Sequence, residues 1–368
     1  MLQQRRKFLM SMAAAAGGAA VAGCTTTQGT PNTATLRGYS VPAIDLHAHW
    51  RAPEFVALIE KEGGANGGKV SKNARGQVVF DAPGLGTVFQ EQYMSLEMRL
   101  KAMDATGVDI HALSETSPMV YWATPAFGLK LSQVYNDALA AACQKYPTRF
   151  VGLMTLPMQA PELAMQELER AAKLPGIKGV YLATAVNGKN LDDKSFFPIY
   201  ARCEALNLPV LLHPINPVGA DRMRSWYLRN FIGNPTDTGI AAASLIFGGV
   251  MDAFPKLDVV LPHAGGITPI LIGRWDHGSG VRPETKHMTK APSTYLRRFH
   301  YDTISHSPSI MATIIKQVGA DRVVLGSDHP ADMSVERPVD FVESIPELSR
   351  SEREMILGGN AKRLLKLT

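Results

Sequence analysis

The chain has little cysteine, few aromatic residues and almost no uncompensated charge. It holds 3 cysteines and 7% aromatic residues in 368, and its formal net charge is +5. Three of its 38 basic residues, Arg5, Arg6 and Lys7, are clustered at the amino terminus, and the remaining 35 nearly balance 33 acidic residues. This low cysteine content excludes a small disulfide-stabilised scaffold. The dispersed, balanced charge argues against a nucleic-acid-binding surface, so we expect no nucleic acid partner.

Long hydrophobic runs are also absent, although 45% of the residues are hydrophobic. No segment beyond the amino terminus is long and apolar enough to span a membrane. A chain of this length and composition can bury the core of one large globular domain. Cys143 and Cys203 fall on different predicted helices, which follow the second and fourth predicted strands. We therefore expect two buried thiols and no bridge between them.

The first residues are typical of an export signal. Arg5 and Arg6 form a twin-arginine pair, and residues 10–22 form a small-residue apolar stretch too short for a membrane span. We assign residues 1–23 to a twin-arginine signal peptide and expect a periplasmic protein.

The apolar stretch ends in Val21-Ala22-Gly23-Cys24, which resembles a bacterial lipobox. In that interpretation Cys24 is lipidated and holds the protein on a membrane, and residues 24–40 are a flexible tether. Thr25 follows the cysteine in place of an inner-membrane-retaining Asp, which favours the outer membrane. The alternative is a buried cysteine after an accidental apolar run.

From residue 41 the sequence alternates strand-like apolar runs with amphipathic helices. The predicted strands are 41–44, 108–113, 150–155, 177–183, 208–212, 257–261, 299–304 and 322–325. The predicted helices include 53–62, 95–106, 163–173 and 195–206. Eight strands joined by crossovers predict an α/β fold, a (β/α)8 TIM-type barrel, over residues 41–368. A Gly-rich insertion at about 63–92 follows the first strand, and its Val78-Val79-Phe80 suggests a hairpin.

Four polar motifs follow predicted strands, where barrel enzymes build their sites. They are Asp45-Leu46-His47-Ala48-His49, His213-Pro214, His263-Ala264-Gly265-Gly266 and Gly326-Ser327-Asp328-His329-Pro330. Residues two apart on a strand share a face, so the His-x-His motif can present two imidazoles together. Nitrogen and oxygen ligands of this kind suit Zn, and less readily Mn or Fe. The pattern predicts a metalloenzyme.

The region from Val41 to Leu367 resembles the amidohydrolase superfamily, and within it the branch of aminocarboxymuconate semialdehyde decarboxylase. The shared stretches are Phe150-Val151-Gly152-Leu153, residues 155–164, Gly248-Gly249-Val250, Phe254-Pro255-Lys256-Leu257, Gly273-Arg274, His277-Gly278 and Val324-Leu325-Gly326. The resemblance implies one divalent metal, usually Zn, held by His47, His49, His213 and Asp328. It also implies that His263 is the acid or base beside a metal-bound water, and we count Asp328 as a catalytic residue as well as a ligand.

The fourth predicted strand ends in Val180-Tyr181-Leu182-Ala183-Thr184 and offers no Lys or Glu for a second metal. Lys178 lies at its wrong end, so we expect a mononuclear site.

The resemblance also implies a homodimer with shared sites, in which Arg274 reaches from the neighbouring subunit to a substrate carboxylate. A plain helix-surface Arg is the alternative. The second carboxylate-binding Arg of the branch corresponds here to Phe80. Substrates are then expected to carry one anchored carboxylate rather than two, unless Arg75 compensates.

Further polar and aromatic residues have open roles. Asp45 either orients a ligand histidine or accepts backbone hydrogen bonds, and His329 is expected to line the pocket. Glu115 is either an acid that reaches the mouth of the barrel or an exposed loop residue. His111 is expected to pack in the core or lumen, and the role of His306 stays open. Three aromatic residues could wall an aromatic substrate or simply pack: Trp122, Trp226 and Tyr227.

These features predict a metal-dependent, non-oxidative decarboxylase of an aromatic or unsaturated carboxylic acid. A short-lived cytosolic muconate intermediate does not suit an exported protein, so the substrate of the branch is not carried over. Hydrolysis of an ester, lactone or amide on the same site is the alternative. A lipid-anchored binding protein without turnover is the third possibility.

Overall fold

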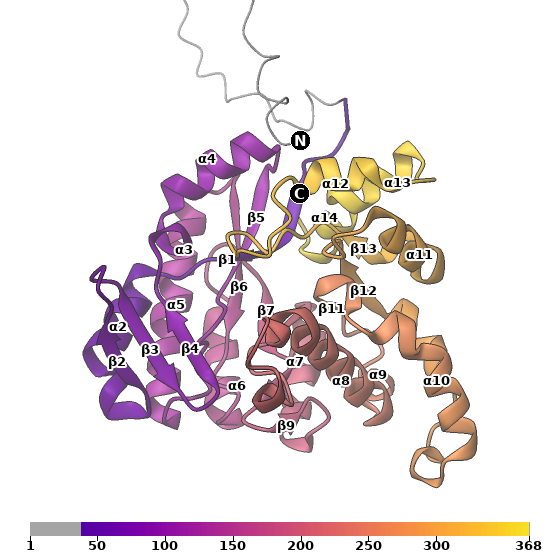
Figure 1. Cartoon of the computed structure of the whole chain (residues 1–368), viewed down its shortest axis with the longest axis horizontal. Helices are drawn as coiled ribbons and strands as arrows, with labels where there is room; N and C mark the ends of the chain where they lie inside the picture. Colours follow the sequence, from indigo (N-terminus) through magenta and orange to yellow (C-terminus); the bar gives the residue numbers. More distant parts are fainter. Residues whose placement is uncertain (1–37, 368) are drawn as a thin grey trace, which may run out of the picture. The chain divides into compact units, whose positions relative to one another are not determined.

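A computed structural model describes residues 38–367 of the chain. Eight parallel strands form one sheet in the order β1-β5-β6-β7-β10-β11-β12-β13 (Figure 1). The strands are β1 (Ile44–His49), β5 (Ile110–Ser114), β6 (Phe150–Thr155), β7 (Ile177–Ala183), β10 (Val210–His213), β11 (Val259–Leu261), β12 (Phe299–Asp302) and β13 (Val323–Val324). Because each strand pairs with the next one along the sheet, the predicted (β/α)8 fold is confirmed.

The first strand lies beside the segment that follows the last one, which brings the sheet close to a barrel. Leu46 N donates to Leu325 O at 2.9 Å, and Asp328 N donates to His47 O at 2.8 Å. His49 N then donates to His329 O at 2.7 Å. These bonds hold β1 next to the loop that carries Asp328.

The helices lie around the strands (Figure 1). They are α2 (Pro53–Glu62), α3 (Glu91–Met94), α4 (Leu96–Thr106), α5 (Pro125–Lys145), α6 (Pro161–Ala171), α7 (Phe197–Leu206), α8 (Asn234–Phe247), α9 (Val250–Ala253), α10 (Thr268–Val281), α11 (Pro308–Val318), α12 (Pro338–Ser344), α13 (Arg350–Glu354) and α14 (Asn360–Leu364). Many begin with proline in the first turn, where its missing N–H costs nothing. Ser95 caps α4 by accepting from Met98 N, so this helix begins where the sequence predicts it.

The first strand differs from the prediction. Residues 41–44 were expected to form it, but β1 is Ile44–His49 and contains the whole His-x-His motif. All six of its residues are buried, including Asp45, His47 and His49. The prediction ended the strand where the polar residues begin. The barrel accommodates these residues within the strand because each one has a buried hydrogen-bond partner.

The insertion after β1 contains a three-stranded antiparallel sheet of β2 (Lys69–Lys72), β3 (Val78–Ala82) and β4 (Leu85–Val88). The expected hairpin is therefore present, with one further strand. Phe80 on β3 is fully buried, with its ring centroid 4.3 Å from that of Trp122. A Cβ added at Gly68 would come within 2.2 Å of the Phe80 ring, so glycine is needed for this close packing.

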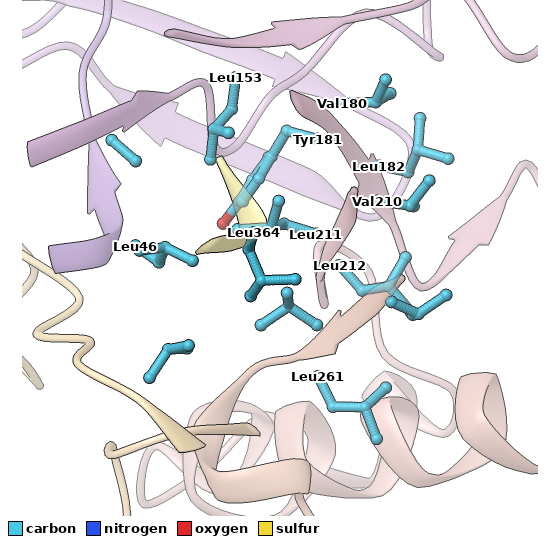
Figure 2. Packing of buried hydrophobic residues seen from close by; sticks show 14 of the residues in the cluster. Leu46, Leu153, Val180, Tyr181, Leu182, Val210, Leu211, Leu212, Leu261 and Leu364 are labelled. Atoms are coloured by element: carbon cyan, nitrogen blue, oxygen red, sulfur yellow. The ribbon is translucent and has the colours of Figure 1, made fainter. Parts of the chain in front are cut away.

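Apolar side chains from many elements form one buried core. Figure 2 shows its part around the central strands, with Leu46, Leu153, Tyr181, Leu211 and Leu261 from five strands and Leu364 from α14. Cys143 and Cys203 are buried and free, as expected. Among residues 38–367, no helix is long and apolar enough to cross a membrane. The predicted signal and Cys24 lie outside the described residues.

Candidate metal centre and cavity

Four side chains from three parts of the sheet converge at one end of the barrel. His47 and His49 come from β1, His213 ends β10, and Asp328 follows β13. One ligand atom from each lies within 4.8 Å of the others. His49 Nε2 lies 2.8 Å from Asp328 Oδ1 and 3.2 Å from His47 Nε2. The structure thus brings together all four residues that the sequence predicts as ligands.

Neighbouring groups fix the orientation of the two β1 imidazoles. His47 Nδ1 lies 2.7 Å from Asp302 Oδ2, a carboxylate that can only accept, so Nδ1 carries the proton. His49 Nδ1 lies 3.2 Å from Ser114 Oγ, whose hydroxyl donates to Ala48 O. Because both Nδ1 atoms are engaged in this way, the Nε2 atoms are the ones available to a metal ion beside Asp328.

The charges of the cluster also fit a cation. Burial lowers the pKa of His49 to about 4 and that of His213 well below its usual value, so both are neutral, the form that binds metals. Burial also lowers the pKa of His47, but hydrogen bonds to Asp302 and Asp328 outweigh it and raise that pKa to about 10. The cluster therefore favours a positive charge between two carboxylates. Three nitrogens and one carboxylate oxygen suit Zn or Mn.

Asp302, at the end of β12, is the functional residue that the sequence analysis missed. Besides His47 it accepts hydrogen bonds from His263 N at 3.0 Å and Ala264 N at 2.8 Å. It therefore orients one ligand and also fixes the start of the loop that carries His263. The available signal was an acid inside a predicted buried strand, since buried carboxylates need partners.

His263 lies beside the four ligands. Its Nε2 is 3.8 Å from Asp328 Oδ2, and its ring centroid is 5.3 Å from that of His47. Its backbone φ is +53°, a conformation rare for a non-glycine residue. Cβ atoms added at Gly265 and Gly266 would meet Tyr301 and Pro235 within the protein. The glycines therefore serve packing that holds His263.

Asp45 holds the Asp328 loop and does not touch a ligand ring nitrogen. It accepts hydrogen bonds from His47 N at 2.9 Å, from Ser327 N at 3.1 Å and from the Ser327 hydroxyl. Of the two roles considered, acceptance of backbone bonds is the one observed.

A cavity of about 300 Å³ opens beside the cluster. It is lined by His49, Arg51, Gly86, Tyr93, Thr116, Ser117, His213, Pro214, Ile215, Tyr227, Arg229, Asn230, Asn234, Asp328, Ala331 and Asp332. Strands β1 and β10 thus supply its metal-ligand wall, and the insertion and the loop after β10 supply much of the rest. Of the residues proposed to contact substrate, Tyr227 lines this cavity.

The structure places the other five proposed contacts elsewhere. Trp122 packs against Phe80 and does not line the cavity. The remaining four are Phe80, Trp226, His329 and Arg274. Phe80 is buried in the insertion, and Trp226 is 85% exposed. His329 packs against His111, with ring centroids 5.5 Å apart. Arg274 is exposed on α10. None of the four lines the cavity formed by residues 38–367.

The remaining candidates have mixed outcomes. Glu115, expected to be exposed, is fully buried, and burial raises its pKa to about 8. The error came from reading a polar residue after a strand as a solvated loop. His111 packs in the core, where Arg99 lies 3.0 Å from its Nδ1. Arg75 and His306 are exposed.

Comparison with known proteins places this arrangement in a family. Residues 44–367 match the sequence model of the amidohydrolase family. The chain belongs to the amidohydrolase family. It is 37% identical over 334 residues to a 2-amino-3-carboxymuconate-6-semialdehyde decarboxylase of Dictyostelium discoideum, with 88% of this chain and 91% of that protein covered. The resemblance to this branch of the superfamily is thus confirmed.

Two solved structures share the fold. The 5-carboxyvanillate decarboxylase of Sphingomonas paucimobilis has a TM-score of 0.77 and 26% identity, with 89% of this chain and 100% of that one covered. The dihydroxybenzoic acid decarboxylase of Polaromonas has a TM-score of 0.73 and 27% identity, covering 89% and 97%. The second was solved with bound manganese and the inhibitor 2-nitroresorcinol.

Proposed function

We propose that this amidohydrolase is a metal-dependent, non-oxidative decarboxylase of an aromatic or unsaturated carboxylic acid. The observation that carries the proposal is the group of four ligand residues with His263 beside it, 3.8 Å from Asp328. Relatives that cover most of the chain are named as decarboxylases of carboxymuconate, resorcylate and carboxyvanillate compounds. Their shared reaction type supports the assignment. Because their substrates differ, the substrate of this chain has to be inferred from its own cavity.

The reaction replaces a carboxylate with a proton. The bond between the ring or alkene carbon and the carboxylate breaks, carbon dioxide leaves, and the electron pair takes up the proton. A divalent ion bound by the cluster would supply positive charge that holds and polarises a substrate oxygen. His263 is the proton carrier that we assign, because its Nε2 lies at the edge of the cluster and an imidazole can give and take a proton near neutral pH. Asp328 would help to hold the ion, and its carboxylate also faces His263.

Zn is the metal that we propose, at one ion per chain, because three imidazoles and one carboxylate form a four-ligand set of the kind it prefers. The manganese in the Polaromonas relative makes Mn the alternative to test.

A homodimer with shared sites is the second part of the proposal. Arg274 lies on the same face of α10 as Ile270 and Val281, which are 71% and 62% exposed. Exposed apolar side chains beside an Arg suit contact with another subunit. In this arrangement Arg274 reaches a carboxylate in the partner's cavity.

Export by the twin-arginine route, with a lipid on Cys24, completes the proposal. Twin-arginine transport carries folded proteins, so the site could be loaded with its metal before export. Residues 1–23 would then be removed, and the barrel would stand on its tether at the periplasmic face of a membrane, with the outer membrane preferred.

A substrate panel tests the reaction type. Aromatic acids, esters and lactones would be incubated with metal-loaded and metal-free protein, and carbon dioxide and released acid would be measured side by side. The proposal expects carbon dioxide from acids with the metal present. Acid release from esters or lactones alone would establish the hydrolase. Tight binding with no product in either assay would establish the binding protein.

A further inference from the structure

Arg51 is a buried cation in the wall of the cavity, two residues after the ligand His49. Its side chain is part of the cavity lining although the residue is only 5% exposed. The buried Glu115 is its main acidic neighbour, but no carboxylate among residues 38–367 lies within ion-pair distance of its guanidinium. An unpaired buried charge is costly, so a protein keeps one only where it has a use.

The contacts of Arg51 leave one side of the guanidinium open. Nε and Nη2 donate to Ser117 O at 3.1 and 2.7 Å. The guanidinium carbon lies 4.2 Å from the centroid of Tyr93 and 5.5 Å from that of Phe89. Nη1 has no hydrogen-bond partner within the described residues, yet it is not among their fully buried unsatisfied atoms. Two N–H donors are therefore held rigidly at the cavity surface.

The other cation of the cavity, Arg229, is less deeply buried than Arg51. Arg229 Nη2 donates to Gly84 O, Ile215 O and Asn216 Oδ1, and this residue is only half-buried. Arg75, considered from the sequence as a carboxylate ligand, is exposed in the turn between β2 and β3. Phe80 is buried and does not line the cavity. Arg51 is thus the more deeply buried of the two cations that line the cavity, and it follows the ligand His49 by two residues.

We propose that Arg51 binds a second acidic group of the substrate, one that stays on the molecule through the reaction. The departing carboxylate loses its charge as carbon dioxide forms, so a cation bound to it would stabilise the starting acid more than the transition state and slow the reaction. A retained carboxylate keeps its charge and can serve as a fixed handle. The substrate class is therefore an aromatic or unsaturated acid with two acidic groups, most simply a dicarboxylic acid. This inference rests on the proposed function, because it takes the bound acid to be a substrate. Its binding test does not depend on turnover.

The test compares two probes on the zinc-loaded protein: benzoate, with one carboxylate, and benzene-1,3-dicarboxylate, with two. Their dissociation constants would be measured by calorimetry at one ionic strength for the wild type, Arg51→Gln, Arg51→Lys and Arg75→Gln. Arg75→Gln is the matched control, because it removes the same charge from an exposed position, in the insertion after β1.

We expect the wild type to prefer the dicarboxylate, and Arg51→Gln to lose about tenfold or more of that preference while benzoate binding changes little. Arg51→Lys should keep part of it, and Arg75→Gln should match the wild type. Thermal unfolding midpoints show whether Arg51→Gln is folded. If it is misfolded, the comparison of the two probes is made with Arg51→Lys. An equal loss for both probes in Arg51→Gln and Arg51→Lys would overturn the proposal and leave Arg51 as a structural clamp on Ser117. If the preference behaves as expected but no acid releases carbon dioxide, the proposed function fails while the subsite stands.

Discussion

His47 Nδ1 lies 2.7 Å from Asp302 Oδ2, and both side chains are buried. This contact joins β1 to β12 and decides which nitrogen of His47 faces the other ligands. The same carboxylate accepts the N–H groups of His263 and Ala264, so one residue orients a metal ligand and the proposed proton carrier.

Replacement of Asp302 by Asn should weaken metal binding by about 10- to 100-fold, the usual effect of losing the carboxylate behind a metal-bound histidine. Competition with a chromogenic chelator measures this affinity. Asp258→Asn is the control, because Asp258 forms a similar pair with His300, 3.3 Å apart, away from the ligands. Equal affinity in Asp302→Asn and the wild type would contradict the role of Asp302.

Replacement of His213 by Ala should lower the metal content from about one divalent ion per chain, and activity should fall in parallel, since one of four ligands is lost. Elemental analysis of the purified wild type and of the purified His213→Ala variant measures the metal content of each. Two tightly bound ions per wild-type chain would contradict a mononuclear site.

Replacement of His263 by Ala should leave the metal content near normal while turnover falls on the order of a hundredfold or more, the usual effect of losing a positioned acid or base. If the ion is lost with the imidazole, His263 is itself a ligand.

Mixing the His263→Ala protein with Arg274→Ala should restore some activity, because a mixed dimer can contain one site with both residues. The measurement is turnover before and after subunit exchange, with exchange verified by mass-tagged subunits. Absence of recovery in verified mixed dimers would refute the shared site.

Glu115 gives a prediction for pH. Burial raises its pKa from 4.5 to about 8, so the folded chain keeps a proton that the unfolded chain releases between these values. Its contribution to stability is present below pH 4.5 and is lost as the pH rises through 8. Relative to the wild type, Glu115→Gln should therefore gain in unfolding temperature between pH 5 and pH 8, while the exposed Glu97→Gln should not. An unchanged difference at the two pH values would show that Glu115 is already ionised in the folded state.

The sequence predicts the barrel and the metal ligands well because both depend on local signals. Apolar runs mark the strands, and His-x-His, His213 and Asp328 stand at strand ends, where a parallel barrel gathers them. The error in β1 arose because buried polar residues look like loop residues until their partners are known. Arg51 gave no signal of this kind, since its role depends on Ser117 and Tyr93, which come from distant segments.

Aromatic side chains were the least predictable part of the site. Phe80 and Trp226 have the right chemistry for a substrate wall, but one packs inside the insertion and the other faces solvent. The sequence shows that an aromatic residue is present near the site. The direction of its side chain depends on the backbone geometry of the insertion and of the loop after β10.

The most direct test of the proposed reaction is decarboxylation in heavy water by the metal-loaded protein, with product mass and carbon dioxide measured together. We predict one carbon dioxide for each acid consumed and one deuteron at the carbon that lost its carboxylate, with both signals absent in metal-free protein. Consumption of substrate without carbon dioxide and without a new carbon–deuterium bond would contradict the account.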